Sequence, residues 1–221
     1  MEVALAAVQK LRAGSRPGTA LKDVKEVRTV LGVVRWRDEG TVPEDAMQLV
    51  LAPRLPRLSG REAAAMDELV ESTRANLEGR SFQPKVLPHP YAFNLFNHNT
   101  AIDPTTGYND EETKVIKETR KIFEDEKIAV GVTCVRVPVF VSHSEAVNIE
   151  FENEISADEA RNILREAPGV MVVDKREPGG YVTPVEAVGE YATYVSRIRE
   201  DPTVENGLSL WVVSDNLRKG A

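Results

Sequence analysis

The chain has 221 residues, of which 42% are apolar and 29% charged, and it carries a formal net charge of −7. This length suffices for one large domain or two small ones, and the composition is that of an ordinary globular protein. The negative charge argues against non-specific binding to nucleic acid or to an anionic membrane, because both require a basic surface.

The sequence carries no sign of export or membrane insertion. No apolar run approaches the ~20 residues that a membrane helix requires. The N-terminal stretch "MEVALAAVQKLRAGSRPG" lacks the continuous apolar core of a signal peptide. The single cysteine excludes an internal disulfide and fits a reducing compartment. We therefore expect a cytoplasmic protein.

Residues 1–58 show only weak patterns. An apolar stripe near the N-terminus, formed by Ala4, Ala7, Val8 and Leu11, is compatible with a helix, and "VRTVLGVVRW" (27–36) with a strand. The stretch "LVLAPRLPRLSG" then places two prolines where a regular element would not accept them.

Three later segments share the pattern of a capped amphipathic helix. Each begins with Ser or Asn followed three residues later by Glu, which is the sequence signature of a capping box. The pairs are Ser59 with Glu62, Asn109 with Glu112, and Ser156 with Glu159. Gly79 and Gly169 follow the first and third segments, where glycine commonly ends a helix. The predicted apolar stripes are Met66, Leu69, Val70, Thr73 and Leu77; Val115, Ile116, Thr119, Ile122 and Phe123; and Ala160, Ile163, Leu164 and Ala167.

Strand-like segments outnumber these helices and do not alternate with them one by one. The segments are 127–141, "AVNIEFE", "VMVVD", "ATYVSRIR" and 208–214, with a short extended piece near 91–96. This order predicts an α+β fold with a mixed, largely antiparallel sheet and helices on one face. The chain has neither a G-x-G-x-x-G fingerprint nor a P-loop, so we expect no complete Rossmann domain.

The stretch "CVRVPVFVSHSE" (134–145) combines a cysteine, an arginine and a histidine. Arg136 lies in an otherwise apolar strand, so it needs a structural carboxylate partner or serves to bind a substrate carboxylate. His143 follows the predicted strand, where it is either a proton-transfer group or an ordinary surface histidine. Cys134 shares a face with Arg136, and the cation could activate the thiol. We favour the alternative, a small buried apolar residue, because cysteine within an apolar strand usually has that role.

The remaining polar residues give weaker indications. Glu111 and Lys114 lie three apart near a helix start, a spacing typical of a solvated ion pair that adds little stability. His89 and His98 have no partners at metal-ligand spacing, so we expect no metal site.

Several ordered motifs together carry a family resemblance. They are "AAAMDELVEST", "GYNDEETKVIKETRKIF", "TCVRVPVFVSHSEAVNIEFE", "REPGGYVTPVEAVGE" and "SRIREDPTVENGLSLWVVSDNLRKGA". From about residue 59 to 221 the chain resembles the catalytic and dimerisation half of aspartate-semialdehyde dehydrogenase. The resemblance implies a domain, residues 59–221, whose sheet pairs across a homodimer. Residues 1–58 look unlike the family and form an atypical N-terminal segment.

The resemblance also implies a reaction and site residues. L-Aspartate 4-semialdehyde, phosphate and NADP interconvert with 4-phospho-L-aspartate and NADPH, a step toward lysine, threonine and methionine. Arg136 falls on the family's substrate-binding arginine and His143 on its acid/base histidine. Glu111 falls on the glutamate that meets the substrate amino group, and Lys114 on the lysine that meets phosphate. Asn216 corresponds to an asparagine close to the cofactor.

The chain departs from the family at the nucleophile. The family's Asn-x-x-Cys-Thr type motif precedes the helix that begins near Ser59, and this chain has no cysteine there. Cys134 matches a strand cysteine that is not the nucleophile, and 58 residues are too few for a cofactor domain. Two hypotheses therefore stay open: an NADP-dependent oxidoreductase, or part of one, and a non-catalytic dimerisation and substrate-binding module. We expect the chain on its own to be inactive.

Overall fold

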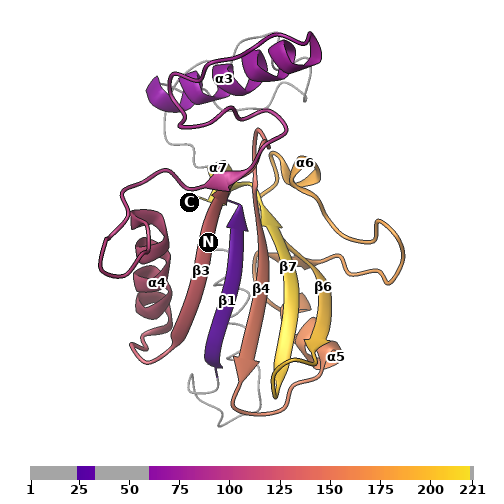
Figure 1. Cartoon of the computed structure of the whole chain (residues 1–221). Coiled ribbons are helices and arrows are strands. Elements are labelled where there is room, and N and C mark those ends of the chain that lie inside the picture. The colour runs from indigo at the N-terminus through magenta and orange to yellow at the C-terminus, as the bar shows by residue number, and fades with distance from the viewer. Residues whose placement is uncertain (1–23, 33–59, 220–221) are drawn as a thin grey trace.

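The computed structural model describes residues 24–32 and 60–219, shown in Figure 1. The strands are β1 (Val24–Gly32), β2 (Phe96–Asn97), β3 (Ala129–Arg136), β4 (His143–Phe151), β5 (Val170–Val172), β6 (Thr193–Asp201) and β7 (Gly207–Ser214). The helices are α3 (Gly60–Leu77), α4 (Asp110–Phe123), α5 (Ala157–Arg165), α6 (Pro184–Ala187) and α7 (Asn216–Lys219).

These strands form one seven-stranded sheet in the order β2-β3-β1-β4-β7-β6-β5. Only the pairs β1–β3 and β5–β6 are parallel, and the other four are antiparallel. The predicted α+β class with a mixed, largely antiparallel sheet is confirmed.

Strand β1 comes from the N-terminal segment and lies in the middle of this sheet (Figure 1). Its backbone pairs Leu31 with Cys134 of β3 on one side and with Glu145 of β4 on the other. The expected helix near Ala4 and the end of the expected strand, residues 33–36, lie outside the described residues. The domain division at residue 58 stays a prediction.

Side-chain caps mark the residues at which α4 and α5 begin. At α4 the Asn109 side chain accepts from the Glu112 N–H at 2.9 Å, and Glu112 Oε2 accepts from the Asn109 N–H at 3.0 Å. The predicted capping box is therefore present. Ser156 caps α5 through the Glu159 N–H at 3.1 Å. Ser59, the predicted cap of α3, lies outside the described residues.

Helices α4 and α5 cover one face of the sheet and share an apolar core with it. This core contains Phe123 at the end of α4, Ile128 after it, Ala160 and Leu164 of α5, and Val147, Ile149, Phe151, Val195, Ile198, Leu208, Leu210 and Val212 of the strands. Alternation along β4 and β7 places every second side chain in this core. Helix α3 lies beyond the strand ends (Figure 1), where Met66 and Leu69 form a second cluster with Leu87 and Tyr91. Leu77, predicted to belong to the apolar stripe of α3, is 74% exposed, because the last turn extends past this cluster.

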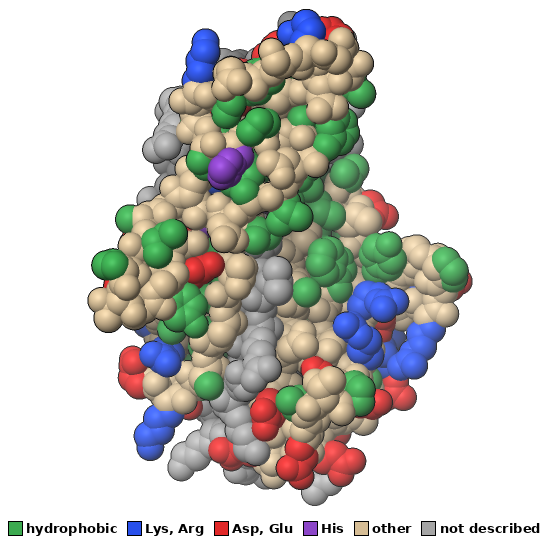
Figure 2. Space-filling view, viewed as in Figure 1, with side chains coloured by type: hydrophobic (Ala, Val, Ile, Leu, Met, Phe, Trp, Pro, Cys, Tyr) green, Lys and Arg blue, Asp and Glu red, His purple; other side chains and the backbone are tan. Residues whose placement is uncertain are grey.

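The opposite face of the sheet is turned to the viewer in Figure 2. Over β6 and β7 it carries Tyr194, Trp211 and Val213, which pack against Val182 and against Ala187 of α6, whereas on β3 and β4 it carries small and polar side chains. Ala129 and Thr133 of β3, with Ala146 and Asn148 of β4, are exposed on it. Among the described residues, no helix is both long and apolar enough to span a bilayer.

Candidate functional site

Arg136 and His143 lie at the same end of the sheet although they are on different strands. Arg136 is the last residue of β3 and His143 the first of β4, and these strands run in opposite directions on either side of β1. Gly32, at the end of β1, pairs with both Val135 and Ser144. Two strand spacings, about 10 Å, therefore separate the two residues along the sheet.

Arg136 is held by the segment that follows β2. Its Nε donates to Asn99 Oδ1 at 2.6 Å, and its Nη2 lies 3.2 Å from His98 Nε2. Both of these partners lie next to β2, and the carboxylate partner from a helix that the structural interpretation expected stays a prediction. A guanidinium oriented in this way is half-buried and can offer its fork to an oxyanion.

His98 connects Arg136 to both β3 and α4, and the sequence analysis set this residue aside. It is 6% exposed, and its backbone N–H donates to the Cys134 carbonyl at 2.8 Å. Its Nδ1 lies 3.3 Å from Thr100 Oγ1, which also accepts from the Glu111 N–H at 3.4 Å. No sequence signal marks this role, because Arg136 is 38 residues away along the chain.

His143 is buried and not a loop residue, contrary to the expectation from sequence. It is 4% exposed and pairs with Ser214 of β7. The preceding Ser142 has a φ of +82°, a left-handed conformation that a serine rarely adopts, and its N–H donates to Asn216 Oδ1 at 3.2 Å. Asn216 thus fixes the backbone that leads into His143.

Asn216 begins α7 and is itself held in place by its neighbour Asp215. Asp215 Oδ1 accepts from the N–H groups of Leu217 at 2.8 Å and Arg218 at 3.2 Å, while Oδ2 accepts from Gly189 at 2.7 Å. Asn216 is 2% exposed, so its place beside Ser142 is set by β7 and α7 together. The resemblance placed Asn216 near the cofactor, and that role stays a prediction.

Glu111 and Lys114 form the ion pair that their spacing predicted, but the pair is not fully solvated. Lys114 Nζ lies 3.9 Å from Glu111 Oε1 and 3.7 Å from Glu118 Oε1. Glu111 is buried at 8% exposure, whereas Lys114 keeps about a third of its side chain exposed. A buried carboxylate beside a partly exposed ammonium at a helix start is an arrangement that can bind a zwitterion or an anion.

Glu112 ties the beginning of α4 to β3. Its Oε2 belongs to the capping box, and its Oε1 accepts from the Cys134 N–H at 2.9 Å. One buried side chain therefore sets how the Glu111–Lys114 pair lies relative to the strand that carries Arg136.

Cys134 is a buried structural thiol, as the favoured interpretation of the sequence held. It is fully buried against Val115 of α4 and Val132. Burial, assisted by the nearby carboxylates of Glu112, Glu111 and Glu145, raises the pKa of the Cys134 thiol from its usual 9.0 to about 12. The thiolate needed for nucleophilic attack is therefore strongly disfavoured at neutral pH.

Tyr91 lies close enough to Arg136 to respond to its charge. Burial raises the pKa of the Tyr91 phenol, and the positive charge of Arg136 partly opposes this change. The phenol donates a hydrogen bond to the Val137 carbonyl, immediately after Arg136. The loop between α3 and β2 is in this way fastened to the end of β3.

Neither a metal centre nor a dinucleotide cradle is evident in the part of the chain that the structure describes. No three His, Cys, Asp or Glu side chains converge there as a metal ion would require. None of the described strands leads through a glycine-rich turn into a helix, which is the arrangement that holds a pyrophosphate. The described residues therefore do not fit a dinucleotide.

Comparison with known proteins gives a consistent result. Residues 57–219 match the family model described as semialdehyde dehydrogenase, dimerisation domain. An aspartate-semialdehyde dehydrogenase from Aquifex aeolicus is 47% identical over 166 residues, which are 74% of this chain and 48% of that protein. One from Rickettsia bellii is 43% identical over 178 residues, 80% of this chain and 52% of that protein. The chain thus spans about half the length of these curated relatives.

Solved structures agree with these matches. Aspartate semialdehyde dehydrogenase II from Vibrio cholerae superposes with a TM-score of 0.77 at 29% identity, covering 99% of this chain and 55% of that one. A structure of the same Vibrio cholerae enzyme complexed with ASA gives a TM-score of 0.72 at 29% identity over 90% and 51% of the two chains. The enzyme from Candida albicans, solved with NADP, gives a TM-score of 0.55 at 17% identity over 96% and 49%, and shares the fold alone.

Proposed function

The chain belongs to the semialdehyde dehydrogenase dimerisation-domain family, and from this membership we propose that it is the substrate-binding and dimerisation part of an aspartate-semialdehyde dehydrogenase. The observation that carries the proposal is the orientation of Arg136 by Asn99 and His98 at the sheet end where His143 also lies. That sheet end brings an oxyanion-binding guanidinium and a proton-transfer group to one place.

Arg136 binds the carboxylate of the substrate. A guanidinium presents two parallel N–H donors to a carboxylate, and the contacts to Asn99 and His98 fix the plane of this fork before a ligand arrives. The Vibrio cholerae structure with ASA supports a small amino acid aldehyde as the ligand class. Preorganisation of this kind increases affinity because less side-chain entropy is lost on binding.

Glu111 and Lys114 bind the other charged groups. The buried Glu111 carboxylate meets the substrate ammonium, and Lys114, partly exposed, meets phosphate. The position at the start of α4 assists phosphate binding, because the N-terminal end of a helix dipole attracts anions. The Thr100–His98 contacts connect this pair to Arg136.

His143 serves as the acid and base. An imidazole both accepts and donates a proton near neutral pH, and a thiol or a tetrahedral adduct would need such a partner. The buried left-handed turn at Ser142 and the Asn216 hydrogen bond hold the His143 backbone in one position. Proton transfer depends on such placement because the distance between the heavy atoms must be short.

The chain on its own binds but does not oxidise. Its one cysteine is buried in the sheet with a raised pKa, so it forms no thioester with the substrate. NADP, which the Candida albicans structure contains, finds no pyrophosphate cradle among the described residues. A non-catalytic substrate-binding module is therefore the second candidate function, and the burial of Cys134 favours it.

Calorimetric titration with a phosphonate analogue of 4-phospho-L-aspartate tests the proposal. We expect saturable binding to the wild-type chain and at least a tenfold loss of affinity in Arg136→Ala, since the fork and its charge are both removed. Arg136→Lys keeps the charge without the fork and should lie between the two. Arg165→Ala, on the exposed end of α5, is the matched control and should bind as the wild type does. Equal affinities of wild type and Arg136→Ala would refute the proposal.

A further inference from the structure

A charged pocket lies at the far edge of the sheet, away from the candidate site. It has a volume of about 460 Å³ and is formed by residues 174–179 and 181 together with residues 197–199 of β6. In the sheet order, β1, β4 and β7 separate β6 from β3, which carries Arg136. Figure 2 shows basic side chains gathered at this edge, although the whole protein is acidic.

A β-bulge forms one wall of the pocket. The register between β6 and β7 changes from Ser196–Trp211 to Arg199–Ser209, so β6 contains one extra residue there. Arg197 lies within this bulge and adopts a left-handed backbone conformation with φ of +55°. Regular alternation would turn Arg197 toward the apolar core, because Val195 already points there.

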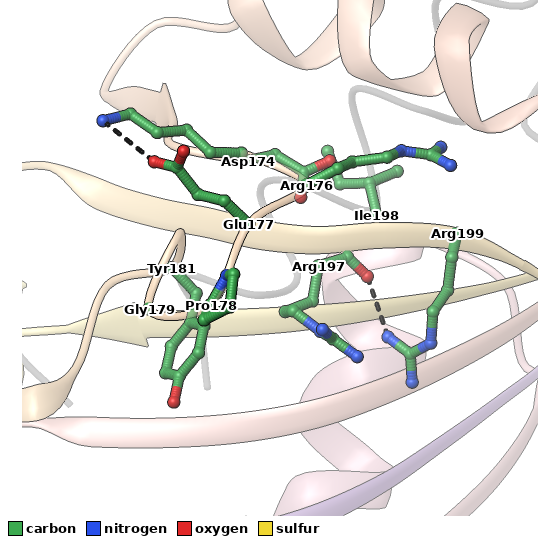
Figure 3. Close-up of a pocket in the computed structure, with 10 residues that line it drawn as sticks. Asp174, Arg176, Glu177, Pro178, Gly179, Tyr181, Arg197, Ile198 and Arg199 are labelled. Atoms are coloured by element: carbon green, nitrogen blue, oxygen red, sulfur yellow. Dashed lines mark hydrogen bonds and ion pairs between the residues drawn. The ribbon is translucent and has the colours of Figure 1, made fainter.

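The bulge therefore exposes two arginines on the same side of β6. Arg197 and Arg199 are both exposed, while Ile198 between them is buried in the core. Arg199 Nη1 donates to the Arg197 carbonyl at 2.8 Å, and Figure 3 shows both side chains projecting to one side of the strand. Strained backbone at a bulge commonly marks a place where side chains are aimed for binding.

The opposite wall is a closed turn. The Lys175 N–H donates to the Gly180 carbonyl at 3.0 Å, and the Gly180 N–H donates to the Glu177 carbonyl at 3.0 Å. A Cβ on Gly180 would lie 2.5 Å from the Lys175 carbonyl oxygen, so only glycine fits there. This turn carries Lys175, Arg176 and Tyr181 along the rim of the pocket.

Arg161 of α5 joins the two walls from beneath. Its Nε and Nη2 donate to Asp174 Oδ2 at 2.9 and 2.8 Å, and Nη2 also donates to the Ile198 carbonyl at 3.1 Å. Arg161 is 8% exposed and so belongs to the interior. It neutralises Asp174, while Lys175 pairs with Glu177 at 3.8 Å. The lining then keeps an excess of positive charge from Arg176, Arg197 and Arg199.

We propose that this pocket binds a small molecule carrying two oxyanion groups, a diphosphate or a dicarboxylate. Two neighbouring guanidinium groups match such a ligand, because each presents parallel donors to a phosphate or carboxylate. The volume is that of a metabolite site, and the net charge of −7 argues against a long polyanion such as nucleic acid. The ring of Tyr181 covers the less polar part of the ligand.

Amide shifts in ¹H–¹⁵N correlation spectra of the full chain test this site. Inorganic pyrophosphate and succinate are titrated separately at constant ionic strength, and the amides of Gly179 and Gly180 are followed. We expect saturable shifts with at least one probe, and which probe binds more tightly distinguishes the phosphate from the carboxylate ligand. No saturable shift at these amides with either probe at millimolar concentration would overturn the proposal.

Three variants control for folding, charge and location. Arg197→Asn should preserve the left-handed backbone at position 197, since asparagine tolerates that conformation. It removes the guanidinium and should weaken binding at least tenfold. Arg165→Asn removes an exposed arginine elsewhere and should leave the titration unchanged. Lys114→Ala should also leave it unchanged. Shifts confined to the start of α4, or equal binding by Arg197→Asn, would show that the pocket is not the site, whatever the outcome at Arg136.

Discussion

Cys134 and Arg136 are two residues apart on β3, yet their surroundings give them opposite properties. Cys134 packs under α4, where burial and three nearby carboxylates raise the pKa of its thiol. Arg136 lies at the strand end, where Asn99 and His98 orient its guanidinium. Activation of the thiol by the arginine was the less favoured interpretation of the sequence, and burial together with the carboxylates acts against it by raising the pKa of the thiol.

We expect the Cys134 thiol to be unreactive in the native protein. An aromatic disulfide reagent at pH 8 should label it slowly in buffer and at once in denaturant, because the folded chain buries the sulfur and disfavours the thiolate. Equal labelling rates in the two conditions would contradict the buried position.

The raised pKa also predicts a loss of stability in alkali. Between pH 9.0 and about 12 the folded state keeps a proton on Cys134 that the unfolded state releases. The contribution of Cys134 to the free energy of unfolding is therefore fully present below pH 9.0 and is lost as pH rises toward 12. Urea denaturation across this range should show a smaller decline for Cys134→Ala. Burial of Tyr91 acts in the same direction, so some decline remains in that variant.

At the scale of elements, α4 is fastened to the sheet at its first turn. Glu112 uses one carboxylate oxygen for the helix cap and the other for the Cys134 N–H of β3. The cap was predictable because its partners lie three residues apart. The bond to Cys134 spans 22 residues and depends on how α4 packs, so no local pattern announces it.

Glu112→Gln should lower the free energy of unfolding by roughly 1–3 kcal/mol, because its amide nitrogen cannot accept the second buried N–H. Glu159→Gln is the matched control. It changes the same position of α5, where only the Ser156 hydroxyl makes the cap bond, and it should cost much less. Urea denaturation followed by circular dichroism measures both. Comparable losses in the two variants would mean that the β3 contact contributes nothing.

At the scale of the whole molecule, helices cover one face of the sheet, and among the described residues the opposite face is covered only over β6 and β7. Helices α4 and α5 bury the apolar side chains of one face. On the other face, α6 and Val182 pack on Trp211 and Val213 of β7, while Ala129, Thr133, Ala146 and Asn148 of β3 and β4 remain exposed. The small side chains on β3 and β4 allow a second sheet to approach this part of the face closely. Together with the family's description as a dimerisation domain, this face supports a homodimer through the sheet.

Ala146 lies near the middle of this face, between Val30 of β1 and Trp211 of β7. We expect the wild-type chain to sediment as a dimer at tens of micromolar and Ala146→Arg to sediment as a monomer, because like charges and bulk would meet at the interface. Glu154→Arg, exposed beyond the end of β4, is the control and should remain a dimer. A monomeric wild type would refute the interface.

The sequence by itself indicated the longer helices, most of the strands and the class of the fold. Capping boxes, apolar periodicity and β-branched runs act over a few residues, and the structure confirms α4, α5 and a largely antiparallel sheet. It also singled out Arg136 and His143 as a pair seven residues apart. Only the tertiary structure decided that His143 is buried, that His98 orients Arg136, and that a bulge in β6 joins Arg197 to a distant turn. These features depend on contacts between segments far apart in the chain, and strand order and register, which create such contacts, leave no local trace in the sequence.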